Sequence, residues 1–178
     1  MIFGALLWSA VMSAAVPAPF IRIEQTEPIS QKTLITFGTV QDGNGFGMSC
    51  FEGGERFRIS VAPKRFYGSP GGAGLFAPTT VHRFSRAPKP QADRWSYLNE
   101  TLQFKGIGAL RQNKQIASFI HNLRRDDTFS IRYEPMRGRG ETLTFNYKVS
   151  DKDLDAFLSE CAPKRVLHYL DEWRETGM

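Results

Sequence analysis

Three stretches of the chain alternate apolar and polar residues with the two-residue period of a half-buried strand. They are residues 56–61, 128–134 and 142–149, and within each stretch the apolar residues fall on every second position. Successive side chains of a strand point to opposite faces of a sheet, so each stretch offers one face to a core. The pattern predicts three β-strands that each bury one side.

Four further stretches are weaker strand candidates, because Gly, mixed periodicity or nearby Pro interrupts their alternation. They are residues 33–40, 46–51, 79–84 and 97–104. Residues 134–141 separate two of the clear strands and hold one Pro and two Gly, which predicts a hairpin connection with Arg137 and Arg139 at its tip. Residues 63–90 hold five of the ten prolines and predict a long loop that includes an edge strand.

Two helices are predicted from apolar residues spaced i, i+3, i+4 and i+7. One stripe starts at Ile116 and ends at Leu123, and the other starts at Leu154 and ends at Cys161. Ser150 is placed to cap the second helix, and Pro163 marks its end. Residues 164–175 predict a last short helix, which either packs back on the domain or lies outside it.

The order of these elements is strands, a helix, a two-stranded hairpin and a helix. That order favours an α+β fold, an antiparallel β-sheet with helices packed on one face, over a parallel doubly wound sheet. The chain of 178 residues is long enough for one domain. We expect a single α+β domain over residues 30–161 and a C-terminal helical extension over residues 162–178.

The first 20 residues contain no charged side chain, and residues 2–16 form an apolar run broken only by Gly and Ser. Such a run is typical of a signal peptide, here over about residues 1–18, and predicts a periplasmic or secreted protein. Cleavage after Ala15 and cleavage after Ala18 both remain open. No Lys or Arg precedes the run, so a buried helix and an uncleaved membrane anchor are the alternatives.

The two cysteines, Cys50 and Cys161, form no CxxC motif and have no histidine at metal-ligand spacing. In an exported protein two such cysteines tend to oxidise. Cys161 lies on the apolar stripe of its helix, and Cys50 lies two positions after Met48 in a candidate strand. We therefore expect one disulfide between them, with Cα atoms about 4.4 to 6.8 Å apart.

Residues suited to catalysis or metal binding are few and scattered. His82, His121 and His168 lie on three different predicted elements, and no metal-ligand spacing or G-x-S-x-G motif occurs. Asp126 and Asp127 are adjacent in a turn and should point apart. Residues 43–47 lack the Lys-Ser/Thr of a phosphate-binding loop and predict a hairpin turn. We expect no catalytic residues, no metal and no cofactor.

The basic residues suggest a binding surface. The formal net charge is +5, all of it after residue 20, and most of the basic residues are arginines, which suit carboxylate and phosphate groups. They form either a scattered, solvated surface or a face for an acidic envelope protein or an anionic envelope component. Nucleic acid is not expected outside the cytoplasm, and membrane contact is expected only through an uncleaved N-terminus. The candidates for this face are Arg83, Arg86, Arg124, Arg125, Arg132, Arg137 and Arg139.

The second half of the chain resembles a known pattern. Residues 80–84, Trp95, residues 119–123, 130–133 and 144–147, and a helix closing on Cys161 follow the order of the VasI/TagO-type periplasmic proteins associated with type VI secretion. The resemblance covers residues 79–161. Asn146 departs from it where Asp is usual, and Asp151 where Gly is usual.

The resemblance implies an envelope protein with a disulfide and carries over no catalytic residue. The expected function is that of a non-enzymatic periplasmic accessory or binding protein, with an association with type VI secretion implied by the resemblance alone. The alternative is a cell-wall-directed hydrolase or an inhibitor of an envelope enzyme.

Overall fold

The strands form two sheets. The computed structural model describes residues 16–29, 31–64, 80–87, 91–93, 95–98, 101–104, 109–133 and 141–176. One sheet has five strands in the order β1 (Ala18–Pro19), β11 (Glu141–Lys148), β10 (Thr128–Tyr133), β6 (Thr80–Phe84) and β7 (Gln91–Asp93). The other has six, in the order β2 (Ile21–Thr26), β3 (Thr33–Gln41), β4 (Asn44–Phe51), β5 (Glu55–Ala62), β9 (Thr101–Phe104) and β8 (Trp95–Leu98).

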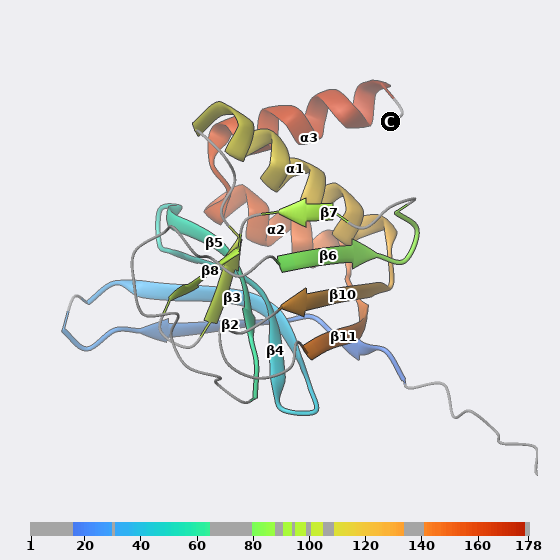
Figure 1. The fold of residues 1–178 in the computed structure, drawn as a ribbon. Helices are drawn as coiled ribbons and strands as arrows, with labels where there is room; N and C mark the ends of the chain where they lie inside the picture. The colour runs from blue at the N-terminus through green and yellow to red at the C-terminus, as the bar shows by residue number, and fades with distance from the viewer. Residues whose placement is uncertain are drawn as a thin grey trace, which may run out of the picture.

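The helices lie together on one side of the two sheets (Figure 1). They are α1 (Ala109–Arg125), α2 (Asp151–Cys161) and α3 (Lys164–Thr176). Among the described strand pairs only β1 with β11 is parallel. The predicted α+β class with antiparallel pairing is thus confirmed, and the strands divide between two sheets where the sequence predicted one.

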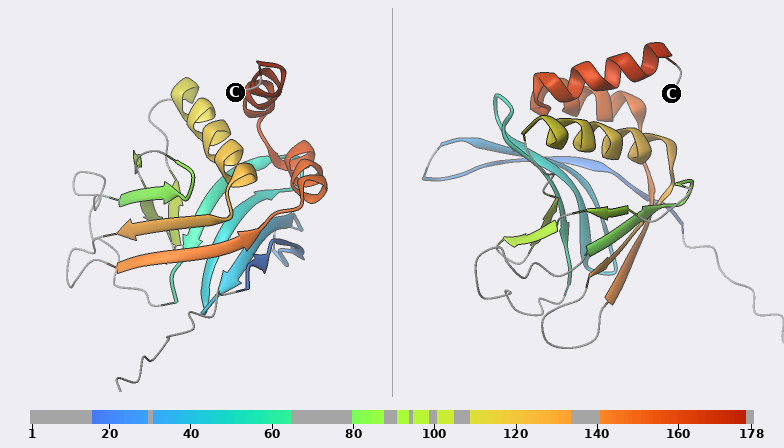
Figure 2. Two further views of the ribbon diagram at one scale, coloured as in Figure 1. Left: turned by 90° about the vertical axis from the view of Figure 1, so that its right-hand side faces the viewer. Right: turned by 45° about the horizontal axis from the view of Figure 1, so that its top comes forward.

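The core lies between the inner faces of the two sheets and the helices α1 and α2, whose arrangement is seen in Figure 2. Phe46 of β4 stacks on Phe129 of β10, with ring centroids 4.4 Å apart, and lies 5.3 Å from Phe145 of β11. Phe119 of α1 lies 5.4 Å from Phe129. Aromatic pairs of this kind contribute about 0.5 to 1.5 kcal/mol each beyond the area they bury. The apolar residues on alternate positions of β10 and β11 are therefore the ones that pack against the six-stranded sheet.

The predicted helices are present, and the last one packs on the domain. The Ser150 hydroxyl accepts the Asp153 backbone N–H at 3.4 Å, as an N-cap does, and α2 ends at Cys161, two residues before Pro163. In α3, Val166 is fully buried, and the Trp173 ring lies 5.8 Å from the His121 ring of α1. Of the two alternatives for this segment, the structure shows packing against α1.

The predicted disulfide between Cys50 and Cys161 is confirmed. The two Cα atoms are 5.6 Å apart, and both residues are buried. The bridge joins β4, inside the six-stranded sheet, to the end of α2. Because 111 residues separate the two cysteines in sequence, the bond ties a strand near the start of the chain to a helix near its end.

The strand predictions agree with the structure in most places. The strand predicted over residues 97–104 is instead two paired strands, β8, which starts at Trp95, and β9. A turn at Asp42 and Gly43, both with positive φ, connects β3 to β4. Of the turn predicted over residues 43–47, only Gly43 is in the turn, and residues 44–47 begin β4. The segment before residue 30 is part of the fold, since β2 pairs with β3 and Phe20 is buried. Residues 134–140 of the predicted connection and most of the 63–90 loop lie outside the described residues.

The predicted signal segment lies almost entirely outside the described residues, which begin at Val16. Ala18 and Pro19 pair with Tyr147 and Lys148 of β11, so a cut after Ala18 would remove part of β1. In the part of the chain that the structure describes, no helix is both long enough and apolar enough to span a membrane.

Candidate binding surface

The outer face of the five-stranded sheet carries side chains from β6, β10 and β11. Phe84, Phe129 and Phe145 point into the core, so by alternation their strand neighbours point outward. Ser130 pairs in register with Arg83 on one side and with Thr144 on the other. The three side chains therefore form a row across the sheet, and the Ser130 and Thr144 hydroxyls are 3.0 Å apart and hydrogen bonded.

This outer surface, the basic sheet face, combines cations with hydroxyl groups. Arg83, Arg132 and Lys148 are exposed on it, and the described outward positions of β6, β10 and β11 include no carboxylate. Such a surface offers charged donors for anions beside neutral hydroxyls that both donate and accept. Its residues are Val81, Arg83, Thr128, Ser130, Arg132, Thr142, Thr144, Asn146 and Lys148.

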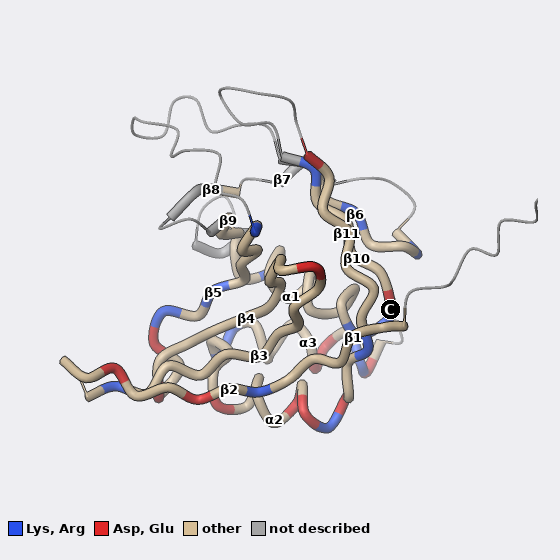
Figure 3. The backbone as a smooth tube through the Cα atoms, turned by 90° about the horizontal axis from the view of Figure 1, so that it is seen from below, with Lys and Arg blue, Asp and Glu red and all other residues tan. Residues whose placement is uncertain are grey.

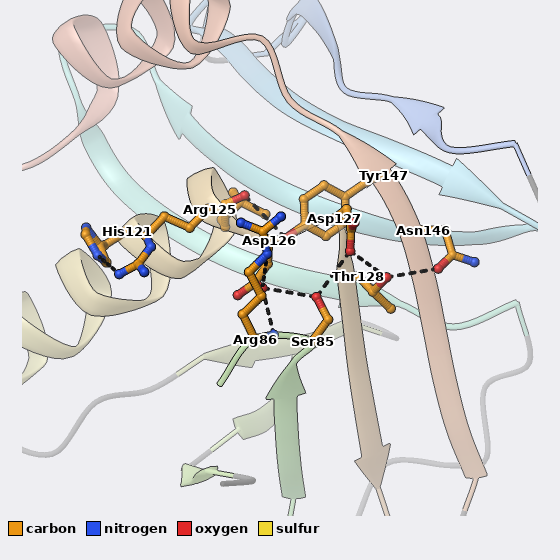
Figure 4. A network of polar contacts seen from close by, with 10 residues as sticks. Ser85, Arg86, His121, Arg125, Asp126, Asp127, Thr128, Asn146 and Tyr147 are labelled. Atoms are coloured by element: carbon orange, nitrogen blue, oxygen red, sulfur yellow. Dashed lines mark hydrogen bonds and ion pairs between the residues drawn. The ribbon is translucent and has the colours of Figure 1, made fainter. Parts of the chain in front are cut away.

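An acidic turn between α1 and β10 closes one end of the basic sheet face (Figure 4). The Asp126 side chain is only 2% exposed, and its Oδ1 accepts the Ser85 hydroxyl at 3.0 Å and the Arg86 backbone N–H at 2.8 Å. The Arg86 Nε lies 3.9 Å from the same oxygen. Asp126 therefore joins the end of β6 to the turn after α1.

The expectation that Asp126 and Asp127 point apart is wrong. The Ser85 hydroxyl donates toward both carboxylates, at 3.0 Å to Asp126 and 3.2 Å to Asp127. Asp127 also accepts the Thr128 hydroxyl at 3.1 Å. The hydrogen bonds from Thr128 and then Ser85 lower the pKa of Asp127, so its carboxylate stays ionised at neutral pH. The two aspartates stabilise a turn around one serine.

Neighbouring polar groups extend this network toward both sheets. The Tyr147 hydroxyl donates to the Leu123 carbonyl at 3.3 Å, and burial, followed by the charges of Asp126 and Asp127, raises the pKa of this phenol. The Gln41 side chain accepts the Asn146 backbone N–H at 2.8 Å and donates to the Asn146 carbonyl. This contact links the end of β3 to β11, so the polar residues hold the two sheets together.

Arg124 is placed away from the basic sheet face and contacts the other helices. It bonds Asp155 and lies 3.5 Å from Asp151, while Arg174 donates to the same Asp155 oxygen at 2.8 Å. Partial burial disfavours ionisation of Asp155, but the hydrogen bonds and charges of Arg124 and Arg174 together outweigh it and lower the pKa of this carboxyl group. Arg124 thereby connects α1 and α2, with Arg174 of α3 at the same carboxylate.

The seven candidate arginines therefore do not form one surface. Arg83 and Arg132 share the basic sheet face, and Arg86 lies at its acidic end. Arg124 and Arg125 lie at the end of α1, where Arg125 is 3.2 Å from His121. Arg137 and Arg139 lie outside the described residues.

The three histidines occupy three different environments. His82 is buried in the core, and its Nδ1 accepts the Trp95 indole N–H at 3.3 Å. The pKa of His121 is lowered by burial and then by the charges of Arg125 and Arg124. His168 is exposed. Within the described residues no group of three or more His, Cys, Asp or Glu side chains could hold a metal ion.

The outer face of the six-stranded sheet has a feature that sequence reasoning missed. A shallow hollow of about 220 Å³ lies over Gly38, Gly45 and Gly47, between Ile21 and Val40. Gly38 pairs with Gly47, and a Cβ on Gly47 would lie 2.6 Å from the Gly38 Cα, so glycine is required there. The glycines on alternate positions were a visible signal, but their meaning depends on the β3 and β4 pairing.

Comparison with known proteins adds no relative. No protein-family model matches the chain, and neither the curated proteins nor the solved structures include a significant match. The functional proposal therefore depends on the chain and its structure.

Proposed function

We propose that this chain is a non-enzymatic protein of the bacterial cell envelope that binds an anionic polysaccharide through the basic sheet face. The observation that carries the proposal is the exposure of Arg83 and Arg132 among hydroxyl groups on one sheet surface. An accessory role beside type VI secretion machinery is part of the proposal and is supported by the resemblance alone.

Two observations support export. A disulfide between buried cysteines is typical of oxidising compartments and rare in the cytosol. The chain also starts with 20 residues that carry no charged side chain and include a long apolar run, as a signal peptide does. An envelope location would bring the basic sheet face into contact with cell-wall polymers.

The chemistry of the basic sheet face favours a polymer that carries both acidic groups and hydroxyls. A guanidinium group binds carboxylate or phosphate through two parallel hydrogen bonds. Ser130 and Thr144 supply hydroxyls next to Arg83, and such groups exchange hydrogen bonds with sugar hydroxyls. Peptidoglycan, with carboxylates on its peptide stems, is a polymer of this kind.

Cosedimentation with insoluble peptidoglycan sacculi tests the proposal. The test variant is Arg83→Glu/Arg132→Glu, which reverses two charges on the basic sheet face. The matched control is Lys152→Glu/Arg165→Glu, which makes the same charge change at exposed positions of α2 and α3. Because an exposed ion pair contributes on the order of 0.2 to 1 kcal/mol and reversal adds repulsion, we expect roughly tenfold weaker binding for the test variant alone.

Salt gives a second readout. Binding of the parent should weaken when NaCl is raised from about 0.05 M to about 0.5 M, because exposed charges are screened over a shorter distance. The test variant should show a smaller salt effect than the control. Equal binding by both variants, or no binding of the parent to sacculi at low salt, would contradict the proposal.

A further inference from the structure

β2 is the longest edge strand among those that the structure describes. Each sheet has two edges, and the other three edge strands, β1, β7 and β8, have two, three and four residues, while β2 has six. All six residues of β2 are exposed, and it has one strand neighbour, β3. Figure 3 shows β2 along the outside of the sheet, beside α2. A long exposed edge is a template for pairing with another strand.

The backbone of β2 presents hydrogen-bonding groups at this edge. The Glu27 N–H donates to the Lys32 carbonyl at 2.9 Å, and the register continues in steps of one from this pair to Ile21 with Gly38. Hydrogen-bonded and non-hydrogen-bonded pairs alternate in an antiparallel ladder. Ile21, Ile23 and Gln25 therefore direct their backbone groups to β3. Arg22, Glu24 and Thr26 direct theirs to the open edge.

We infer that two copies of this chain associate by antiparallel pairing of their β2 edges, about a twofold axis at Ile23. In this register Arg22 of each copy lies opposite Glu24 of the other, and these are the residues whose backbone groups face the edge. The two pairs bring opposite charges together, and opposite charges stabilise a cross-strand pair. The sequence of β2 is thus complementary to itself.

Neighbouring registers are less favourable. A shift of one residue would set edge-facing backbone groups against groups that already bond β3. A symmetric shift of the axis to Arg22 puts two arginines opposite each other, and a shift to Glu24 puts two glutamates opposite each other. Like charges directly opposite destabilise a pair. Of the registers with a twofold axis at Arg22, Ile23 or Glu24, the one at Ile23 pairs the edge-facing backbone groups with each other and also places opposite charges across from each other.

The side chains of β2 support the same arrangement. Ile21 and Ile23 are 51% and 52% exposed and lie at the hollow on the outer face, so pairing would place the apolar residues of two copies side by side. On the opposite face Arg22 already bonds Glu24 at 2.6 Å and Glu160 at 2.7 Å. These bonds hold the Arg22 guanidinium on the sheet face where Arg22 and Glu24 of the two copies would meet. One strand pair buries less than the usual roughly 1,600 Å² interface, so the dimer should be weak and concentration dependent.

Sedimentation velocity of the purified protein at about 5 µM to about 1 mM, a range chosen for an interface below standard size, tests the inference. The parent should shift from monomer toward dimer over this range. Arg22→Glu alone and Glu24→Arg alone each place like charges opposite each other twice, and each should weaken association by at least about tenfold. An equimolar mixture of the two variants restores opposite charges at both pairs, so it should dimerise as the parent does.

One further variant and one further measurement separate edge pairing from other causes. Glu160→Gln removes the second partner of Arg22 but leaves the edge unchanged, and it should dimerise within about twofold of the parent, since the cross-strand pairs are intact. Circular dichroism melting of each variant confirms that it is folded. A parent that stays monomeric at about 1 mM, or folded single variants that dimerise as strongly as the parent, would overturn the inference.

Discussion

Removing the disulfide is the perturbation whose size the structure defines best. Cys50 and Cys161 are 111 residues apart in sequence, and closing a loop of that length lowers the entropy of the unfolded chain by about 16 cal/mol/K. At 25 °C this corresponds to about 4.8 kcal/mol of stability. Native bridges typically contribute 2 to 5 kcal/mol, so we expect a loss of roughly 3 to 5 kcal/mol.

The variant of choice is Cys50→Ala/Cys161→Ala, because both positions are buried and alanine introduces no polar atom there. A loss of that size should lower the melting temperature by roughly 6 to 20 °C in a chain of 178 residues. Urea unfolding at 25 °C, followed by far-UV circular dichroism, gives the free energy directly.

The parent under reducing conditions is the matched control, since it has the same side chains without the bond. It should unfold close to the double variant, and the remaining difference reports the two sulfur atoms alone. If the oxidised and reduced parent unfold at the same urea concentration, the bridge does not constrain the unfolded chain and the reasoning is wrong.

Two further predictions concern the turn after α1 and its neighbouring helix. Asp126→Ala should destabilise the protein by about 1 to 3 kcal/mol, because the Arg86 N–H and the Ser85 hydroxyl lose a buried acceptor. Asp127→Ala, at an exposed position, should destabilise it less. Urea unfolding of the two variants gives both free energies. Because the pKa of His121 is lowered in the folded protein, this side chain takes up a proton at a higher pH in the unfolded chain than in the folded one. Stability should therefore decline as pH falls below about 6.5, and His121→Gln should reduce that decline while His168→Gln should not, as urea unfolding at pH 7.5 and 5.5 would show.

Local patterns in the sequence predicted the elements well. The alternation in residues 128–134 and 142–149 marks β10 and β11, because each has one face in the core. The stripe from Leu154 to Cys161 placed Cys161 on the buried side of α2, which made the disulfide predictable. β2 was missed although Ile21 and Ile23 alternate with charged residues, because the fold was expected to begin at residue 30.

Contacts between distant segments could not be predicted in this way. The division into two sheets depends on β6 pairing with β10 and β5 pairing with β9, and neither pairing joins strands that are adjacent in sequence. The same limit applies to the candidate surface. Arg132 lies two residues after Ser130 in β10 and so on the same face, and Arg83 joins that face only because β6 pairs with β10 in the register that sets Arg83 beside Ser130. The contact of Ser85 with Asp126 spans 41 residues, so the convergence of the two aspartates had no local signal.

The most direct test of the proposed function is to map where an anionic glycan binds. Amide chemical shifts of the ¹⁵N-labelled protein, recorded while soluble peptidoglycan fragments are added, report the contact residue by residue. The proposal predicts shifts concentrated in β6, β10 and β11, at residues such as Arg83, Ser130 and Thr144. Shifts confined to α1, α2 and α3, or no saturable shift at low salt, would contradict it.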